Sequence, residues 1–203
     1  MNLFEKIQNQ NLLPYDGEVF YIPKILSEER ADFFYSSLLQ NISWVRDEVL
    51  MFGKTILTER KVAWYGDKNF SYTYSNKTKF ALEWTSDLLE LKSISESYSR
   101  TSFNACLLNL YHDGNEGVGW HSDDEKSIVD QSCIASISLN AERKFEFKSK
   151  NSGERVSILL EHGSLLLMQG QTQKYWKHQL PKSRKILKPR INLTFRKMEQ
   201  SLV

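Results

Sequence analysis

A succession of short apolar segments separated by turns occupies the second half of this chain and restricts the folds open to it. Turn sequences such as Asp113-Gly114, Ser152-Gly153 and His162-Gly163 separate these segments from Phe103 onward. Many short strands joined by turns are typical of antiparallel sandwiches and barrels. We therefore predict strands at Phe103–Tyr111, Ile134–Leu139, Lys144–Lys148, Val156–Leu160, Ser164–Gln169 and Ile191–Arg196.

The first hundred residues predict helices instead. Ser27 suits an N-cap, carboxylates follow it in the first turn, and apolar residues then repeat at helical spacing: Ala31, Phe34, Tyr35, Leu38, Leu39 and Ile42. A second helix is predicted at about Leu82–Ser93 and a short strand at Glu18–Ile22, whereas Trp44–Phe80 shows no clear periodicity. Helices followed by many strands predict an α+β fold, a jelly roll braced by N-terminal helices.

The length of 203 residues fits one domain, and a hydrophobic fraction of 40% is enough for a packed core. Cys106 and Cys133 both lie in apolar runs, so we expect buried free thiols. No apolar run approaches the roughly 20 residues of a membrane span, and the N-terminus does not resemble a signal peptide. We therefore expect a soluble protein without membrane association, cytoplasmic, or nuclear if the source is eukaryotic.

The charge of the chain is unevenly distributed, although its formal net charge is only +2. Residues 141–203 contain 14 lysines and arginines against 5 carboxylates, and the segment Lys174–Lys197 contains nine cations and no carboxylate. This clustering is consistent with an ordinary solvated face. It is equally consistent with a surface that follows the phosphates of a nucleic acid through counterion release.

His121 and Asp123 are separated by one residue, and His178 follows far along the chain. On an extended segment, side chains two residues apart point to the same side, so this pair can bind one metal ion. Two imidazoles and one carboxylate occupy one face of Fe(II) and leave its other positions open for a co-substrate and O₂. A zinc site would more often use cysteine or a third histidine. The other histidines, His112 and His162, lie beside turn glycines and are interpreted as loop residues.

Together with the alternating polar and apolar residues of Pro189–Arg196, this spacing predicts an oxygenase. The sequence resembles the AlkB family of Fe(II)/2-oxoglutarate-dependent dioxygenases, especially its DNA-repair, double-strand-active branch. The resemblance starts at about Val19, covers nearly the whole chain and is densest in these segments: Asn109–Gly114, His121–Glu125, Ile134–Ser138, His162–Leu166 and Pro189–Arg196. It implies a double-stranded β-helix core in one dioxygenase domain, residues 1–203. Helices and a nucleotide-recognition lid are expected in residues 1–101, and the catalytic core in residues 102–203.

The resemblance also implies binding sites for Fe(II) and 2-oxoglutarate. The metal ligands are His121, Asp123 and His178, and the family pattern assigns co-substrate binding to six residues: Asn109, Tyr111, Arg190, Asn192, Thr194 and Arg196. 2-Oxoglutarate chelates iron at one end, so its far carboxylate needs a cation, for which a guanidinium is best suited. Arg190 is expected to bind that carboxylate, whereas Arg196 holds the chelating end or orients Asp123. Without the motif, these arginines would be interpreted as part of the basic surface.

The implied reaction couples oxidative decarboxylation of 2-oxoglutarate to removal of an N-alkyl group, as in 1-methyladenine or 3-methylcytosine. Succinate, CO₂ and formaldehyde are released, and the base must be flipped out of its stack to react. Candidate substrate-binding residues are Tyr72, Tyr74, Asp124, Glu125, Phe52 and Arg60. Tyr74 is expected to stack on the base and Tyr72 to hydrogen-bond it, while Arg60 contacts a phosphate or the pocket rim.

Two of these assignments have ordinary structural alternatives. Asp124 and Glu125 either contact the exocyclic amine or cationic ring of the base, or form a solvated acidic turn. Phe52 either fills the gap left by the flipped base or packs under a loop. The chain also departs from the family in the lid, where Asn76 replaces a glycine and a proline is missing near Phe80–Glu83.

The expected partner is DNA, duplex or single-stranded, or else RNA, and the protein is expected to be a monomer. One alternative function is the same chemistry on RNA or on a protein side chain. Another is a non-catalytic binding module that kept the fold. The complete triad and both arginines argue against a pure binder, which has no need of all five residues.

Overall fold

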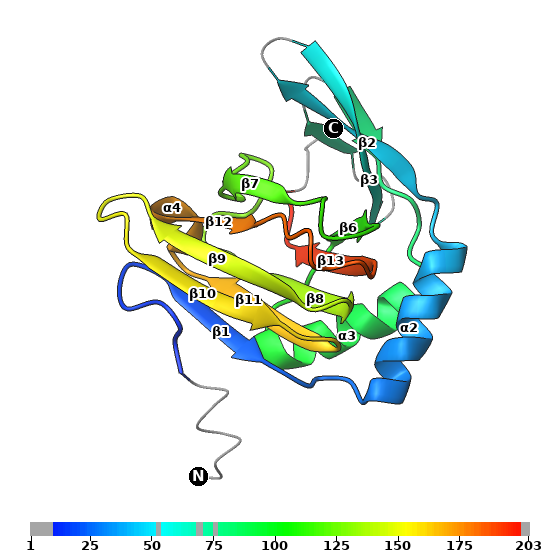
Figure 1. Cartoon of the computed structure of the whole chain (residues 1–203), viewed down its shortest axis with the longest axis horizontal. Coiled ribbons are helices and arrows are strands. Elements are labelled where there is room, and N and C mark those ends of the chain that lie inside the picture. Colours follow the sequence, from blue (N-terminus) through cyan, green and yellow to red (C-terminus); the bar gives the residue numbers. More distant parts are fainter. Residues whose placement is uncertain (1–9, 52–53, 68–70, 75–76, 200–203) are drawn as a thin grey trace.

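The computed structural model describes residues 10–51, 54–67, 71–74 and 77–199, and it contains two antiparallel sheets packed against each other (Figure 1). The larger sheet has seven strands in the order β1-β11-β8-β13-β6-β3-β2, and the smaller has four in the order β10-β9-β12-β7. This arrangement, with helices on one side, confirms the predicted jelly roll.

Strands from both halves of the chain form the larger sheet: β1 (Glu18–Ile22), β2 (Val45–Met51), β3 (Lys54–Gly66), β6 (Ala105–Tyr111), β8 (Ile134–Asn140), β11 (Ser164–Gln169) and β13 (Arg190–Arg196). The smaller sheet contains β7 (Val118–His121), β9 (Arg143–Ser149), β10 (Arg155–Leu160) and β12 (Trp176–Leu180). The predicted strands at Glu18–Ile22 and Ser164–Gln169 are confirmed to the residue. The other five predicted strands are confirmed with ends shifted by one or two residues.

Six strands were not predicted. Four of them fill the segment Trp44–Phe80: β2, β3 and the separate hairpin of β4 (Ser71–Tyr74) and β5 (Lys77–Phe80). The end of β3 shows no polar alternation because residues 62–66 are buried on both faces of the sheet. The other two, β7 and β12, carry metal-ligand candidates. The short helix α4 (Thr172–Tyr175) precedes β12.

The first predicted helix is confirmed as α2 (Glu28–Asn41), and the Ser27 side chain accepts a hydrogen bond from the amide of Arg30. Leu39, predicted to be in the core, is 39% exposed. The predicted bounds Leu82–Ser93 were wrong for the second helix, α3 (Ser86–Ser99). Residue 82 is instead bonded to β3, and Thr85 caps the helix by accepting from the amide of residue 88. The helix continues through its serine-rich end, where Ser95 is buried and its hydroxyl donates to the Leu91 carbonyl one turn earlier.

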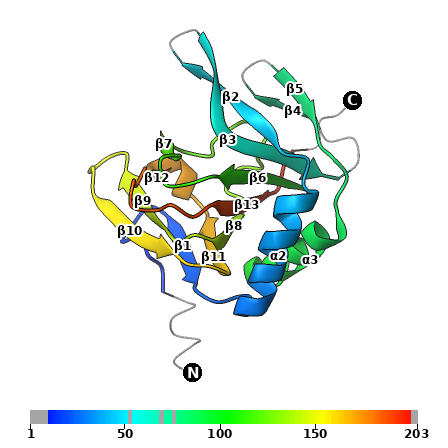
Figure 2. The ribbon, with the colours of Figure 1, turned by 45° about the vertical axis from the view of Figure 1, so that its right-hand side comes forward.

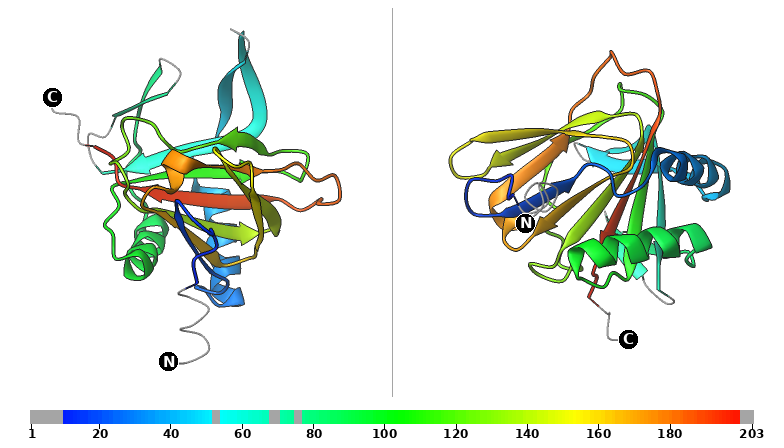
Figure 3. Two further views of the ribbon diagram at one scale, coloured as in Figure 1. Left: turned by 90° about the vertical axis from the view of Figure 1, so that its left-hand side faces the viewer. Right: turned by 90° about the horizontal axis from the view of Figure 1, so that it is seen from below.

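The two faces of the larger sheet have different compositions because side chains alternate along its strands. On β13, Ile191, Leu193 and Phe195 pack with α2 and α3 in the main core, on the face that the helices cover (Figures 2 and 3). The alternate residues of β13 are polar but equally buried, and they line a pocket together with residues of the smaller sheet. The fold thus places a row of buried polar side chains between its two sheets.

Beyond this body, β2 and β3 extend as a hairpin away from the helices (Figure 1). Cys106 and Cys133 are buried free thiols, as predicted, and burial raises the pKa of the Cys133 thiol to about 11. None of the helices in the described part of the chain is long and apolar enough to cross a membrane.

Candidate metal centre and its pocket

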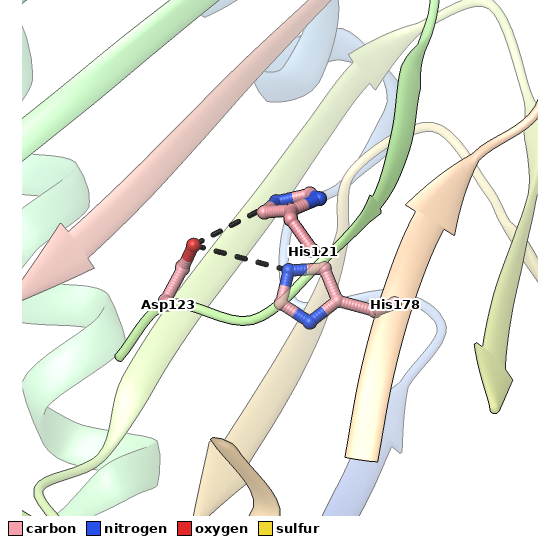
Figure 4. A group of neighbouring side chains, drawn as sticks. All are labelled: His121, Asp123 and His178. Atoms are coloured by element: carbon pink, nitrogen blue, oxygen red, sulfur yellow. Dashed lines mark ion pairs between the residues drawn. The ribbon is translucent and has the colours of Figure 1, made fainter. Parts of the chain in front are cut away.

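The smaller sheet brings the predicted metal ligands together. His121 at the end of β7 is the register partner of His178 on β12, and Asp123 follows two residues after β7. Figure 4 shows the three side chains pointing toward one another. Their potential ligand atoms all lie within 4.8 Å of one another. Asp123 Oδ1 lies 3.7 Å from Nε2 of His121 and 3.9 Å from Nε2 of His178, so both imidazoles present the same nitrogen to this oxygen.

A backbone contact selects the nitrogen that His121 presents to a metal. Its Nδ1 lies 2.8 Å from the carbonyl oxygen of Gly119, and a carbonyl can only accept a hydrogen bond. Nδ1 is therefore the donor in this contact, and Nε2 is the nitrogen directed at the centre of the triad. Among the three ligands, His121 is the most accessible, with 39% of its side chain exposed.

His178 is held in a dry environment. Its ring stacks on Phe145 with centroids 5.4 Å apart, and Phe147 closes another side at 6.2 Å. Burial lowers the pKa of His178 to about 3 and outweighs the opposing effect of Asp123. The imidazole is therefore neutral at physiological pH, which is the form that binds a metal ion.

Asp123 is ionised although it is buried. Burial alone would raise its pKa, but the charge of Arg196 and the two nearby imidazoles lower the pKa to about 2. Arg196 donates from Nη2 to Oδ2 at 2.8 Å, so Oδ1 is the oxygen left facing the histidines. The Asp123 amide also donates to the side chain of Gln173 at 3.0 Å. These contacts orient Asp123 as a ligand through a single oxygen.

Arg190 lies at the other end of the same face of β13 and has a different environment. It is 2% exposed, donates from Nη2 to Ser138 Oγ at 2.9 Å, and stacks over the ring of Tyr111 at 5.6 Å. Its Nε has no hydrogen-bond partner, and no carboxylate pairs with it among the residues that the structure describes. A buried guanidinium without a counter-ion is costly, and an anionic ligand would complete its hydrogen bonds.

The other predicted co-substrate residues share this face. Asn109 and Tyr111 on β6 are buried and line the pocket. Asn192 donates both amide hydrogens to its neighbours, to Ser136 Oγ at 2.8 Å and to the Ile137 carbonyl at 3.0 Å. Thr194 in turn donates to Asn192 Oδ1 at 3.2 Å. A direct hydrogen bond from Asn192 to a ligand would therefore replace one of these bonds, and its predicted role remains a prediction.

The pocket between the sheets has a volume of about 210 Å³ and contains the triad and all six predicted co-substrate residues. Its polar lining includes residues of β13 and β6, the triad, Asp47, Arg60 and Glu125. Apolar side chains complete the wall, among them Val62, Leu107, Phe145 and Leu180. Two imidazoles, one ionised carboxylate and a guanidinium without a counter-ion among the described residues fit Fe(II) beside a dicarboxylate co-substrate.

The structure places some of the predicted substrate-binding residues at the pocket and one of them at the surface. Arg60 and Glu125 line the pocket, whereas Asp124 is 65% exposed on its side chain and lies 3.7 Å from Lys150. Tyr72 and Tyr74 lie in β4, but their side chains fall outside what the structure describes, as does Phe52 entirely. Their predicted roles therefore remain predictions.

Sequence reasoning missed several residues of this region. Asp47 on β2 is buried, lines the pocket and forms an ion pair with Arg60. Gln173 fixes the backbone of a ligand, and Arg143 is buried behind Tyr111, with its guanidinium carbon 5.8 Å from the ring centre. A buried arginine and aspartate in polar segments carry no distinctive spacing. Only the three-dimensional fold reveals them.

Comparisons with known proteins agree with this geometry. The sequence profile of the 2OG-Fe(II) oxygenase superfamily matches residues 18–196. The protein named alpha-ketoglutarate-dependent dioxygenase alkB homolog 3 from Bos taurus is 40% identical over 195 residues, which cover 89% of this chain and 66% of that protein. The protein named DNA oxidative demethylase ALKBH2 from Homo sapiens is 36% identical over 185 residues, which cover 86% of this chain and 71% of that protein.

A solved structure described as the structure of OsALKBH1 aligns with a TM-score of 0.63 over 88% of this chain and 97% of that one. At 15% sequence identity, this likeness concerns the fold alone. The chain spans about two thirds of the length of the curated alkB homolog 3 proteins that it matches. The superfamily profile, the two groups of relatives and the complete triad lead to one conclusion: this chain belongs to the 2OG-Fe(II) oxygenase superfamily and, within it, to the AlkB family.

Proposed function

We propose that this protein is an Fe(II)/2-oxoglutarate-dependent dioxygenase that removes N-alkyl groups from bases in DNA, of the 1-methyladenine and 3-methylcytosine type. The base is restored directly, with release of formaldehyde, succinate and CO₂. The observation that carries this proposal is that one pocket contains both a set of three metal-ligand side chains and a buried cation suited to an anionic ligand. One is the His121–Asp123–His178 triad, and the other is the buried guanidinium of Arg190, which has no counter-ion in the described part of the chain.

Each of these groups has a distinct task in the proposed reaction. When bound, Fe(II) and 2-oxoglutarate supply, with O₂, the oxidation of a substrate C–H bond. The triad holds the metal on one side, with His121 fixed by the Gly119 carbonyl and Asp123 kept ionised by Arg196. Arg190 binds the far carboxylate of the co-substrate, and the stacked ring of Tyr111 keeps its guanidinium in place. The apolar wall excludes water, which strengthens these electrostatic contacts.

Two features support a damaged DNA base as the substrate. The names of the relatives at 36% identity specify DNA oxidative demethylation. Glu125 adds a carboxylate to the pocket beside the triad, and a carboxylate favours the cationic ring that 1-methyladenine and 3-methylcytosine present. An alkylated pairing edge can reach the triad only after the nucleotide is flipped, and a lesion that already prevents pairing lowers the energy of flipping.

RNA carries the same alkylated bases, so it is the second nucleic acid to be tested. We propose that DNA is preferred, that the protein acts as a monomer, and that residues 1–203 form one dioxygenase domain. The shared larger sheet supports this last point, because β1 and β3 pair with β11 and β6. Buried free thiols support a reducing, intracellular location.

The test is incubation of the protein with Fe(II), 2-oxoglutarate and a panel of oligonucleotides. The panel contains 1-methyladenine or 3-methylcytosine in single-stranded DNA, duplex DNA and RNA of the same sequence. Formaldehyde and the restored base are measured by mass spectrometry. We expect restoration in DNA at a higher kcat/KM than in RNA. Turnover of 2-oxoglutarate without restoration of any base would refute the proposed substrate but not the oxygenase chemistry.

A further inference from the structure

Arg143 is a buried cation at the start of β9, and in the described part of the chain its hydrogen bonds and ring contact do not involve the triad. It is 1% exposed, and its guanidinium donates to three backbone carbonyls. Nη1 donates to Asp113 at 3.3 Å, and Nη2 donates to Glu116 at 2.8 Å and to Pro181 at 2.9 Å. No carboxylate forms an ion pair with it among the described residues. Its hydrogen bonds go to neutral carbonyls, which compensate a buried charge less well than a paired carboxylate would. We therefore expect Arg143 to serve by fixing the geometry of the segments that it joins.

The three carbonyls belong to two segments far apart in the sequence. Residues 112–117 connect β6 to β7, and residues 181–189 connect β12 to β13. The segments also bind each other directly. The amide of Gly114 donates to the carbonyl of Ile186 at 2.8 Å, and the amide of Ser183 donates to that of Gly114 at 2.7 Å. A Cβ added at Gly114 would lie 1.9 Å from the Ser183 carbonyl oxygen, so the two backbones are in close contact.

These two segments lead directly into the site. The first leads into β7 and therefore to His121, while the second joins β12, which carries His178, to β13, which begins with Arg190. Tyr111 lies immediately before the first segment, and its ring is within 5.8 Å of the Arg143 guanidinium and 5.6 Å of that of Arg190. One buried guanidinium thus contacts both connections and the aromatic ring against which Arg190 stacks.

We infer that Arg143 is a positioning residue, which joins the two connecting segments and holds Tyr111 and Arg190 at the spacing needed for the far carboxylate of a dicarboxylate co-substrate. This inference rests on the proposed function for the identity of that ligand. It does not require Arg143 to touch the ligand. The loss of Arg143 should loosen both segments and weaken co-substrate binding while leaving the metal ligands in place.

The test compares Arg143→Met with Lys144→Met, which removes the same charge from the next residue. Lys144 is a suitable control because its side chain is 58% exposed and bonds only to Glu146 among the ion pairs described. Hydrogen exchange of the metal-free proteins is measured in peptides covering 112–117 and 181–189. The dissociation constant for 2-oxoglutarate is measured separately with Mn(II), which binds the same kind of ligands without supporting turnover.

For Arg143→Met we expect exchange in both segments to rise. The dissociation constant for 2-oxoglutarate should increase about tenfold, because ligand binding must then order the two loosened segments, and a cost of about 1.4 kcal/mol corresponds to that factor. Affinity for Mn(II) alone should change less than threefold, and Lys144→Met should resemble the wild type throughout. Unchanged exchange in both segments, or an unchanged dissociation constant, would overturn the inference. A uniform rise in exchange over the whole protein would do so as well, because it would indicate a general loss of stability.

If Arg143→Met does not fold, the same two measurements on Arg143→Lys test the inference instead. A lysine keeps the charge but cannot reach three carbonyls with a planar fork. We then expect faster exchange confined to the two segments, together with weaker 2-oxoglutarate binding. Wild-type values for both would overturn the inference. If the wild type itself does not bind 2-oxoglutarate, the proposed function fails, whereas the exchange data still test whether Arg143 holds the two segments together.

Discussion

The two buried arginines on one face of β13 should respond in opposite ways when each is replaced by methionine. Arg196 is paired with Asp123 at 2.8 Å. Arg190 donates to Ser138 and stacks on Tyr111, but it has no carboxylate partner in the part of the chain that the structure describes. We therefore expect Arg196→Met to destabilise the metal-free protein. We expect Arg190→Met to leave its stability unchanged or raise it, while 2-oxoglutarate binding is lost.

The magnitudes follow from burial and pairing. Burial lowers the pKa of Arg190 from its usual range to about 10, opposed by Tyr111. A charged base with a lowered folded-state pKa destabilises the fold below that pKa, and the effect disappears as the pH rises above about 10 toward the usual pKa of a guanidinium. At neutral pH, this shift corresponds to a cost on the order of 3 kcal/mol. The bond to Ser138 offsets about 1 kcal/mol of it, whereas the opposing effect of Tyr111 is already included in the shift.

Breaking the buried pair of Arg196 and Asp123 should instead cost about 3–5 kcal/mol, because it leaves a carboxylate buried without its partner. For a chain of this size, each kcal/mol lost from the free energy of unfolding lowers the melting temperature by about 2–4 °C. Arg196→Met should therefore melt about 10 °C below the wild type, and Arg190→Met at the same temperature or a few degrees above. Loss of a guanidinium–carboxylate contact should weaken 2-oxoglutarate binding by Arg190→Met about 10²–10³-fold.

The assay is thermal unfolding of the metal-free proteins at pH 7.5, followed by the same scan with Mn(II) and increasing 2-oxoglutarate. The wild type should be stabilised by the co-substrate, and Arg190→Met should show almost none of this stabilisation. Equal destabilisation by the two substitutions would refute the view that Arg190, unlike Arg196, has no carboxylate partner among the described residues of the free protein. Wild-type affinity of Arg190→Met for 2-oxoglutarate would refute its assignment to the far carboxylate.

The other predictions concern the metal ligands and the nucleic acid. Replacing His121 or Asp123 by alanine should abolish 2-oxoglutarate turnover, measured as succinate, and an undiminished rate in either variant would contradict the metal site. Phe52→Ala should reduce activity on duplex DNA more than on single-stranded DNA of the same sequence, and equal losses would remove the role of Phe52 in filling the stack. Three cations of the connecting segment 181–189 can be replaced by alanine: Lys182, Arg184 and Lys185. In DNA-binding titrations, this triple substitution should reduce the slope of log K against log salt concentration by about one per residue. An unchanged slope would place this basic segment away from phosphate.

The part of the fold that the sequence predicts best is the part with strong periodicity. The alternation of Ile191, Leu193 and Phe195 with polar residues identifies β13, and that alternation is also why its polar residues reach the pocket. The cap at Ser27 likewise gives the start of α2. In contrast, β3 could not be predicted, because its final residues are buried on both faces and show no period of two.

The strand β12 was missed although its signal is present. Trp176, His178 and Leu180 are buried, and the residues between them are more exposed. The metal ligands were predictable because iron chemistry restricts both the residue types and the spacing. The pairing of Arg60 with Asp47 and the contacts of Arg143 were not predictable, because these bonds join segments whose proximity depends on strand order.

The central claim is that the triad would hold the Fe(II) with which O₂ oxidises an N-methyl group on a DNA base, while 2-oxoglutarate is oxidised to succinate and CO₂. Its most direct test is the quantification of products from a DNA oligonucleotide containing one 3-methylcytosine, incubated with Fe(II) and 2-oxoglutarate. We predict equal amounts of restored cytosine and formaldehyde with the wild type, and neither product with Asp123→Ala. Restored cytosine without formaldehyde, or the same yield from Asp123→Ala, would contradict the account.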